Sequence, residues 1–154
     1  MPMNPQLVGK SYPPLRYEVG REKLREFATA VGETNPLYHD TDVAKAAGHP
    51  DIPAFPTFPV VVANAASRAM HDDGDLGLDY SRVVHGEQEF VYSRPVRAGD
   101  RLVATPRIDR IAPLGRHEML VIETSIDTDE GEHVCTTRAT LVVRGAAPAD
   151  GGSA

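Results

Sequence analysis

The sequence predicts an α+β fold: an antiparallel sheet wrapped around one long central helix, in a single domain. Residues 57–70 have the composition of a buried helix, because apolar side chains occupy nearly every side of it. From Arg82 onward, apolar and polar residues alternate in segments separated by tight turns, which is typical of consecutive strands that pair antiparallel. An apolar helix followed by a strand-rich half predicts a sheet that packs around that helix.

The first half of the chain is expected to be helical. A helix is predicted over residues 21–31, since apolar residues recur there at intervals of three and four, and Gly32 is expected to end it. A second, short helix is predicted to run to residue 47, and Thr41 or Asp42 could cap it.

The central helix is predicted over residues 57–70. Thr57 can cap its free N–H groups, and Pro59 is tolerated in the first turn, where the missing N–H is not needed. The many small residues of this helix would let a sheet approach it closely. The Asp72-Asp73-Gly74-Asp75 segment then ends it.

Strands are predicted throughout the second half, each rich in Val, Ile and Thr. Segments that contain Gly, Pro and Asp supply the turns between them. The predicted strands are Val83–Val91, Arg101–Ile111, His117–Asp127 and His133–Val143.

Composition and charge restrict the class of protein. The chain has 154 residues, 41% of them hydrophobic and 25% charged, as in an ordinary soluble globular domain. A formal net charge of −6, without a run of Lys or Arg, argues against a nucleic-acid partner. The longest apolar run, residues 58–63, is too short for a membrane span, and no signal peptide is recognised. Cys135 is the single cysteine, so no disulfide is expected, and the chain is expected to be cytoplasmic.

Residues 27–44 carry the motif that is most informative about function. They fit a frame made of an aromatic residue, Gly-Asp-x-Asn-Pro-(Leu/Ile/Val)-His, and a small residue further on. The matching residues are Phe27, Gly32, Asn35, Pro36, Leu37 and Ala44. This frame resembles the (R)-specific hydratase signature of the MaoC-like hot-dog family.

A second segment carries the same resemblance. Residues 90–102, with an aromatic residue, Arg-Pro-Val and then Gly-Asp, are similar to a strand–turn–strand signature of hot-dog thioesterases and dehydratases. The Val8-Gly9-Lys10 opening and the segment 54–58 most resemble FAS1-like or MaoC N-terminal dehydratase domains. The resemblance implies a single hot-dog domain over residues 7–145. Residues 1–6 would be an irregular N-terminus, and residues 146–154 a disordered tail.

The resemblance implies hydration of a trans-2-enoyl thioester, or the reverse loss of water from a (3R)-3-hydroxyacyl thioester. This reaction needs an acid/base pair beside one water and a backbone donor to the thioester carbonyl, and it needs no cofactor or metal. The expected ligand is an acyl-CoA or acyl-ACP thioester. Hot-dog units pair side by side, so the expected assembly is a homodimer, or a heterodimer with a catalytic MaoC-like subunit. No membrane partner is expected.

The two chemical residues of the family motif are exchanged in this chain. The catalytic Asp falls on Glu33 and the catalytic His on Tyr38, while His39 lies one position late. A phenol, with an ordinary pKa of about 10, is a poor base at neutral pH. Catalytic relatives have a Gly before the central helix, whereas this chain has Phe55-Pro56-Thr57, and Pro56 has no N–H. We therefore expect the isolated chain to be inactive.

The leading interpretation is a non-catalytic or accessory subunit of a (3R)-3-hydroxyacyl-thioester dehydratase, or enoyl hydratase, of fatty-acid metabolism. In this role the chain would contribute the acyl-chain groove. Phe58, Val61 and Ala65 on the central helix are expected to border that groove, with Asn35 and Tyr38 near its mouth. A purely structural central helix is the competing interpretation.

Two further functions remain open from the sequence. One is a self-sufficient homodimeric hydratase that uses Glu33 together with Tyr38 or His39, and the other is an acyl-thioester binding protein without turnover. A structural interpretation is open for each motif residue as well. Asn35 can simply form a turn, Tyr38 can be a packed aromatic, and Glu33 can be a solvated acid after a helix end.

Overall fold

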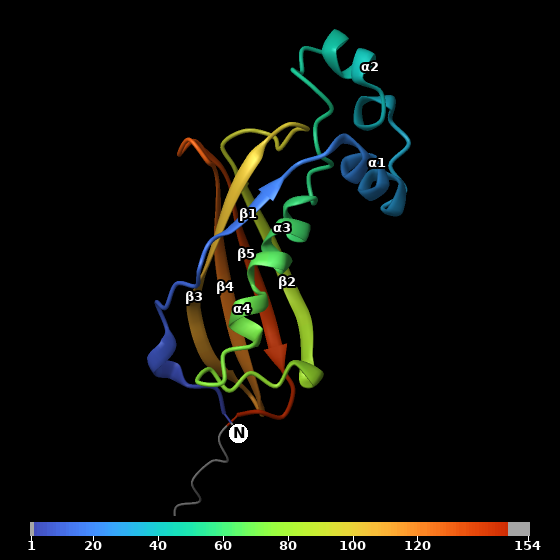
Figure 1. Cartoon of the computed structure of the whole chain (residues 1–154). Coiled ribbons are helices and arrows are strands. Elements are labelled where there is room, and N and C mark those ends of the chain that lie inside the picture. The colour runs from blue at the N-terminus through green and yellow to red at the C-terminus, as the bar shows by residue number, and fades with distance from the viewer. Residues whose placement is uncertain (1, 148–154) are drawn as a thin grey trace, which may run out of the picture.

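The computed structural model describes residues 2–147, which form a five-stranded antiparallel sheet and a small number of short helices. The strand order is β1-β3-β4-β5-β2. Figure 1 shows α3 and α4 lying against the sheet, with α1 and α2 beyond one end of it. The strands are β1 (Leu15–Glu18), β2 (Val83–Tyr92), β3 (Arg101–Leu114), β4 (His117–Thr128) and β5 (His133–Val143). The helices are α1 (Arg21–Ala30), α2 (Thr41–Ala46), α3 (Pro59–Ala66) and α4 (Arg68–His71), with 3-10 turns η1 (Pro5–Leu7), η2 (Pro36–Tyr38) and η3 (Tyr80–Arg82). The predicted α+β arrangement is confirmed.

The sheet contains all four predicted strands and one strand that was not predicted. The additional strand is β1, which pairs antiparallel with β3 from Leu15 opposite Ala104 to Glu18 opposite Arg101. It has four residues and follows Pro13 and Pro14, so its sequence is too short to show an alternation by itself. Its partner strand lies far away along the chain and supplies the pairing.

The two N-terminal helices lie close to their predicted positions. Helix α1 buries Leu24 and Ala28, and Gly32, with a φ of 78°, follows its C-terminal end as expected. The predicted cap of α2 is wrong. Asp40 is the N-cap, because its carboxylate accepts hydrogen bonds from the backbone N–H groups of Asp42 and Val43.

The central helix is shorter than predicted and is interrupted. Phe58 occupies the N-cap position of α3 without a side-chain hydrogen bond, so the predicted cap at Thr57 is wrong. Ser67 separates α3 from α4, and its hydroxyl donates to the carbonyl of Ala63 at 2.9 Å. The backbone N–H of Ser67 bonds to the same carbonyl at 3.0 Å, and a serine that bonds back to the preceding turn in this way often bends a helix.

The core lies between α3, α4 and the facing side of the sheet. Phe58, the N-cap of α3, and Val62 of α3 pack with Leu102, Ile126 and other aliphatic residues, all of them buried. The buried residues of β3 alternate along the strand, as expected for a sheet with one face in the core. Cys135 belongs to this core and is fully buried.

The C-terminal segment of the described chain returns to the sheet. Ala146 is buried, and the backbone N–H of Ala147 bonds to the carbonyl of Arg116 at 3.3 Å. The remainder of the predicted tail, residues 148–154, lies outside the described residues. Within residues 2–147 no helix is long and apolar enough to cross a membrane.

Candidate functional site

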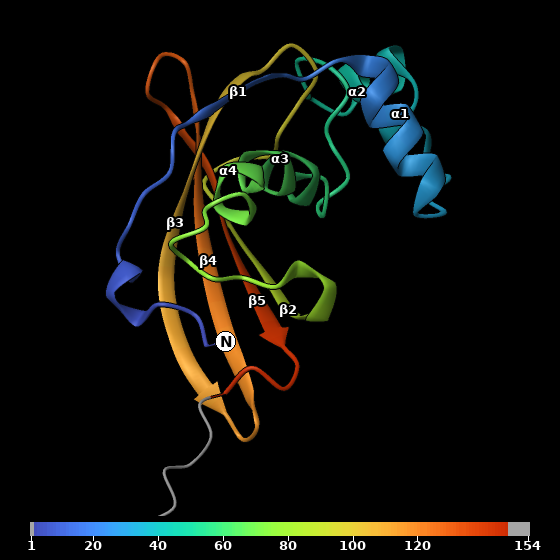
Figure 2. The ribbon, with the colours of Figure 1, turned by 60° about the horizontal axis from the view of Figure 1, so that its bottom comes forward.

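The loop that carries the hydratase-like frame projects from one end of the molecule. It connects α1 to α2 through η2, and these three elements lie together beyond the end of the sheet (Figure 2). The candidate residues Glu33, Asn35, Tyr38 and His39 all lie here. The structure therefore brings together the residues that the sequence had grouped, and the contacts of each side chain show what it does.

Glu33 and Asn35 both bond to the backbone of their own loop. The Glu33 carboxylate accepts a hydrogen bond from the backbone N–H of Asn35 at 2.8 Å, and the Asn35 side-chain oxygen accepts one from Leu37 at 3.0 Å. The second bond is an N-cap that starts η2. Both polar side chains thus fix the shape of the loop.

His39 is fixed in the same way. Its Nε2 lies 2.7 Å from the carbonyl oxygen of Glu33, and since a carbonyl only accepts, Nε2 must carry the proton. Arg25 of α1 donates from Nε to the carbonyl of His39 at 2.8 Å. Nε2 is therefore the donor nitrogen of the neutral ring, and Nδ1 is the nitrogen left to accept a proton.

Tyr38 begins a series of aromatic contacts that runs from the loop into the core. Its ring meets Phe55 edge-on, with centroids 5.7 Å apart. Phe55 lies 6.4 Å from Phe27, and Phe27 lies 5.4 Å from Phe58. The Tyr38–Phe55 and Phe27–Phe58 pairs are edge-to-face, and such pairs add stability beyond the area they bury. Tyr38 thus attaches the projecting loop to the start of α3.

The start of α3 has few free backbone donors. Pro56 and Pro59 have no N–H, and the N–H groups of Val60 and Val61 bond to the carbonyls of Thr57 and Phe58. Tyr92 of β2 donates its hydroxyl to the carbonyl of Pro56. Burial raises the pKa of Tyr92, so this hydroxyl stays protonated.

A cavity of about 250 Å³ lies between the sheet and the helix pair α3–α4. Sequence reasoning did not find its polar lining. Thr124 and Thr137 face each other across β4 and β5, each only 1% exposed, in strands whose other inward residues are mostly aliphatic. Asn64, Ser67, His71, Tyr80, His85 and Gln88 complete the polar part of the lining. A threonine in an inward series of aliphatic residues is the sequence signal for such a polar cavity.

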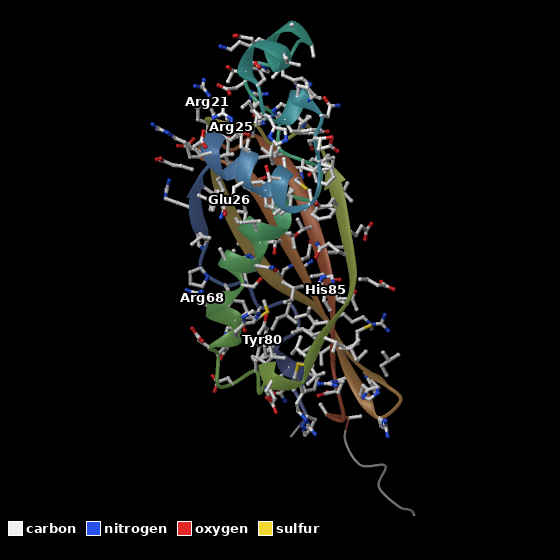
Figure 3. All side chains as sticks on the ribbon, turned by 90° about the vertical axis from the view of Figure 1, so that its right-hand side faces the viewer. Arg21, Arg25, Glu26, Arg68, Tyr80 and His85 are labelled. Carbon is white, nitrogen blue, oxygen red and sulfur yellow. The ribbon has the colours of Figure 1, made fainter. Side chains whose placement is uncertain are left out.

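The three predicted groove residues do not line this cavity. Phe58 is fully buried in the core, Val61 is partly buried against the core, and Ala65 is exposed. Ala63, on another side of the helix, faces the cavity instead. Figure 3 shows Tyr80 and His85 well away from Arg25 and α1, so the cavity and the loop lie towards different ends of the molecule.

One side of the cavity holds a pair of rings in close, tilted contact. His71 and Tyr80 lie with centroids 4.5 Å apart and an interplanar angle of 38°. Burial lowers the pKa of His71, so its ring is neutral at pH values where an exposed histidine is partly charged. The cavity therefore offers neutral hydrogen-bonding groups and no fixed charge from this residue.

The fold and the loop define a class of protein: a hot-dog domain of the MaoC-like dehydratase type. Two solved structures support this class. The HadBC (3R-hydroxyacyl-ACP dehydratase) complex of Mycobacterium tuberculosis matches with a TM-score of 0.79 and 28% identity over 88% of this chain and 96% of that chain. A MaoC-like dehydratase matches with a TM-score of 0.82 and 30% identity over 91% of this chain and 43% of that chain.

The sequence profile of the FAS1-like dehydratase domain region matches residues 6–137, and the chain belongs to this family. A UPF0336 protein of Streptomyces coelicolor is 52% identical over 147 residues, which cover 95% of this chain and 98% of that protein. The resemblance seen in the sequence is thereby confirmed at the level of family and fold.

Proposed function

We propose that this chain is a non-catalytic, accessory subunit of a (3R)-3-hydroxyacyl-thioester dehydratase of cytoplasmic fatty-acid metabolism. One observation carries the proposal: the position of the catalytic His is occupied by Tyr38, whose ring packs edge-on against Phe55 and offers no imidazole nitrogen. Glu33 holds the N–H of Asn35, and the Nε2–H of His39 holds the carbonyl of Glu33. A general base must accept a proton at neutral pH, and a phenol, with an ordinary pKa of about 10, does this poorly.

The start of α3 supports the same conclusion. Stabilisation of an enolate needs backbone donors aimed at the thioester oxygen, and removal of one such donor typically costs about 10²–10³ in rate. Pro56 and Pro59 offer none, and the N–H groups of Phe58, Val60 and Val61 already have partners, which leaves the N–H of Thr57 as the single free donor of residues 56–61. Acid/base catalysis and oxyanion stabilisation are therefore both weakened in the isolated chain.

A partner subunit is proposed to bind along β2. This strand is an edge of the sheet, and it carries exposed apolar side chains at Val84 and Val91. An unpaired edge strand with apolar side chains favours pairing with another chain. The partner would be a catalytic MaoC-like subunit that carries the intact Asp and His, and the acyl chain of its substrate would enter the cavity beneath α3.

A comparison of turnover by the chain alone and by the complex tests this proposal. The isolated chain should hydrate crotonyl-coenzyme A at a rate near background, and Glu33→Gln should leave that rate unchanged. Addition of a MaoC-like subunit with an intact dyad should produce activity. The self-sufficient hydratase replaces this proposal if the chain alone turns over at an ordinary enzymatic rate and Glu33→Gln abolishes it.

The cavity provides a second readout in the same complex. Ala63→Leu should reduce activity on long acyl chains more than on crotonyl thioester, because an added side chain occupies part of the space. Ala65→Leu, on the exposed side of α3, is the matched control and should leave the chain-length profile unchanged. Equal profiles for both variants would show that the acyl chain does not use this cavity.

A further inference from the structure

A group of arginines that is dispersed in the sequence meets at one end of the sheet. Arg82 ends η3, Arg116 lies in the turn between β3 and β4, and Arg144 follows β5. With His117 and Gly145 they line one open hollow of about 360 Å³. We call Arg82, Arg116, Arg144 and His117 the arginine cluster.

Backbone contacts hold the cluster in place. The N–H of Arg144 bonds to the carbonyl of Arg82 at 3.1 Å, and the N–H of Gly145 bonds to Nδ1 of His117 at 2.9 Å. Since Nδ1 accepts this bond, His117 carries its proton on Nε2, which is thus a donor. Gly145 has a φ of 65°, and a side chain there would lie 3.3 Å from Nη2 of Arg82. Glycine therefore lets the Arg82 guanidinium lie close against the backbone.

The arginines of the cluster have no carboxylate partner. Within residues 2–147, no Asp or Glu oxygen lies within 4.0 Å of the guanidinium of Arg82, Arg116 or Arg144. By contrast, Arg107 and Arg138 on the sheet each pair with two or more carboxylates. The nearby acid Asp79 is engaged by Ser81, which lowers its pKa, and Arg82 adds to that effect.

We infer that the arginine cluster is a binding site for a phosphate group. Guanidinium groups match phosphate oxygens with pairs of charge-assisted hydrogen bonds, and His117 adds a neutral donor. Three like charges around one hollow repel one another, and an anion would relieve that repulsion. A concave site on a chain with a net charge of −6 suits a small anionic group better than a nucleic acid.

The source of the phosphate follows from the proposed function, on which this part of the inference rests. Coenzyme A and the prosthetic arm of acyl carrier protein both contain phosphate. The cluster and the α1–α2 loop lie at opposite ends of the sheet (Figure 1), and β3 alone spans about 45 Å at the usual rise per residue. A carrier anchored at the cluster would therefore present its thioester to a neighbouring subunit and not to Glu33 or Tyr38 of the same chain.

Titration of the full chain with phosphate compounds tests the site without any turnover. Wild-type protein should show saturable binding of coenzyme A by calorimetry, with amide shifts centred on His117 and Gly145. Arg116→Gln with Arg144→Gln should weaken that binding by about tenfold or more, since charge-assisted bonds are lost. Arg110→Gln is the matched control, because Arg110 is an exposed arginine of β3 outside the cluster.

Two further ligands distinguish the source of the phosphate. If 3′-dephospho-coenzyme A binds more weakly than coenzyme A, the 3′-phosphate occupies the cluster. If the two bind equally and 4′-phosphopantetheine also binds, the phosphate of the pantetheine arm occupies it. The inference is overturned if wild-type chain binds none of these compounds, or if the double variant binds as the wild type does. Absence of phosphate binding leaves the accessory-subunit proposal intact, and activity of the isolated chain leaves the phosphate site intact.

Discussion

Asn35 keeps the identity it has in the hydratase frame, and the structure shows a reason that does not involve catalysis. Its side-chain oxygen starts η2, and Glu33 in turn holds the Asn35 backbone. The Asn-Pro part of the frame is therefore a turn-forming unit that can persist when the acid/base pair is exchanged. The Glu33 carboxylate likewise stabilises the loop, because it accepts a hydrogen bond from the backbone N–H of Asn35.

Asn35→Ala should destabilise the folded chain by about 1 kcal/mol, the usual cost of losing an N-cap. Urea denaturation followed by far-UV circular dichroism measures this change. Thr34→Ala, an exposed neighbour, is the control and should have little effect. Equal midpoints for the two variants would mean that the cap does not stabilise the loop.

Asp73 should make stability depend on pH in the acid range. Hydrogen bonds from Lys10 and Tyr12 lower the pKa of Asp73 to about 2. The folded state thus favours the ionised carboxylate, so this stabilisation is fully present above the unfolded pKa of about 3.9 and is lost as pH falls towards 2. Asp73→Asn should remove most of the dependence of the melting temperature on pH in this window, whereas Asp75→Asn should leave that dependence unchanged. If the melting temperature of Asp73→Asn still falls with pH as steeply as that of the wild type, Asp73 is not the source of the acid dependence.

Among the elements, the turn between β2 and β3 shows why the Gly-Asp part of the second motif matters. Asp100 accepts hydrogen bonds from Nη1 and Nη2 of Arg94, at 2.9 and 3.0 Å, and from the backbone N–H of Arg97. The Arg94 and Asp100 side chains are only 15% and 8% exposed. This ion pair fixes the turn that leads from the edge strand back into the sheet.

Asp100→Asn should cost about 3 kcal/mol or more, because a guanidinium that is largely buried loses its charged partner. Glu132 is the second partner of Arg94, and its side chain is 57% exposed. Glu132→Gln should therefore cost less than about 1 kcal/mol. Chemical denaturation of both variants makes the comparison. Similar small losses for the two would show that burial does not strengthen the Arg94–Asp100 pair.

The elements also show what the sequence could predict. Strands β2 to β5 were found because each is long enough to display alternation, while β1 is defined by pairing with β3. The break at Ser67 coincides with a side-chain bond to Ala63, which periodicity does not reveal. The arginine cluster was missed because its members are far apart in the sequence and meet only when η3, the β3–β4 turn and the end of β5 come together.

For the molecule as a whole, the exposed edge at β2 is the feature that determines assembly. Val91→Lys on β2, where valine is 55% exposed, should weaken association with a partner subunit or a second copy, because a charged side chain protects an edge strand from pairing. Val8→Lys is the matched control, since Val8 is 45% exposed and its neighbour Gly9 bonds to Ile108 of β3, which β4 and β5 separate from β2. Sedimentation of both variants measures the effect. An association constant that is reduced equally in both, or in neither, would remove β2 as the interface.

Cys135 gives the chain a built-in chemical reporter. Its thiol is fully buried in the core, and burial raises its pKa to about 11, so at neutral pH it is both shielded and protonated. Only the thiolate reacts quickly with alkylating reagents. Because this is the single cysteine, the extent of labelling measures only the exposure of Cys135, which requires β5 to separate from α3. The labelling rate should therefore follow global unfolding, and it should slow when a partner or a phosphate compound binds and stabilises the folded chain.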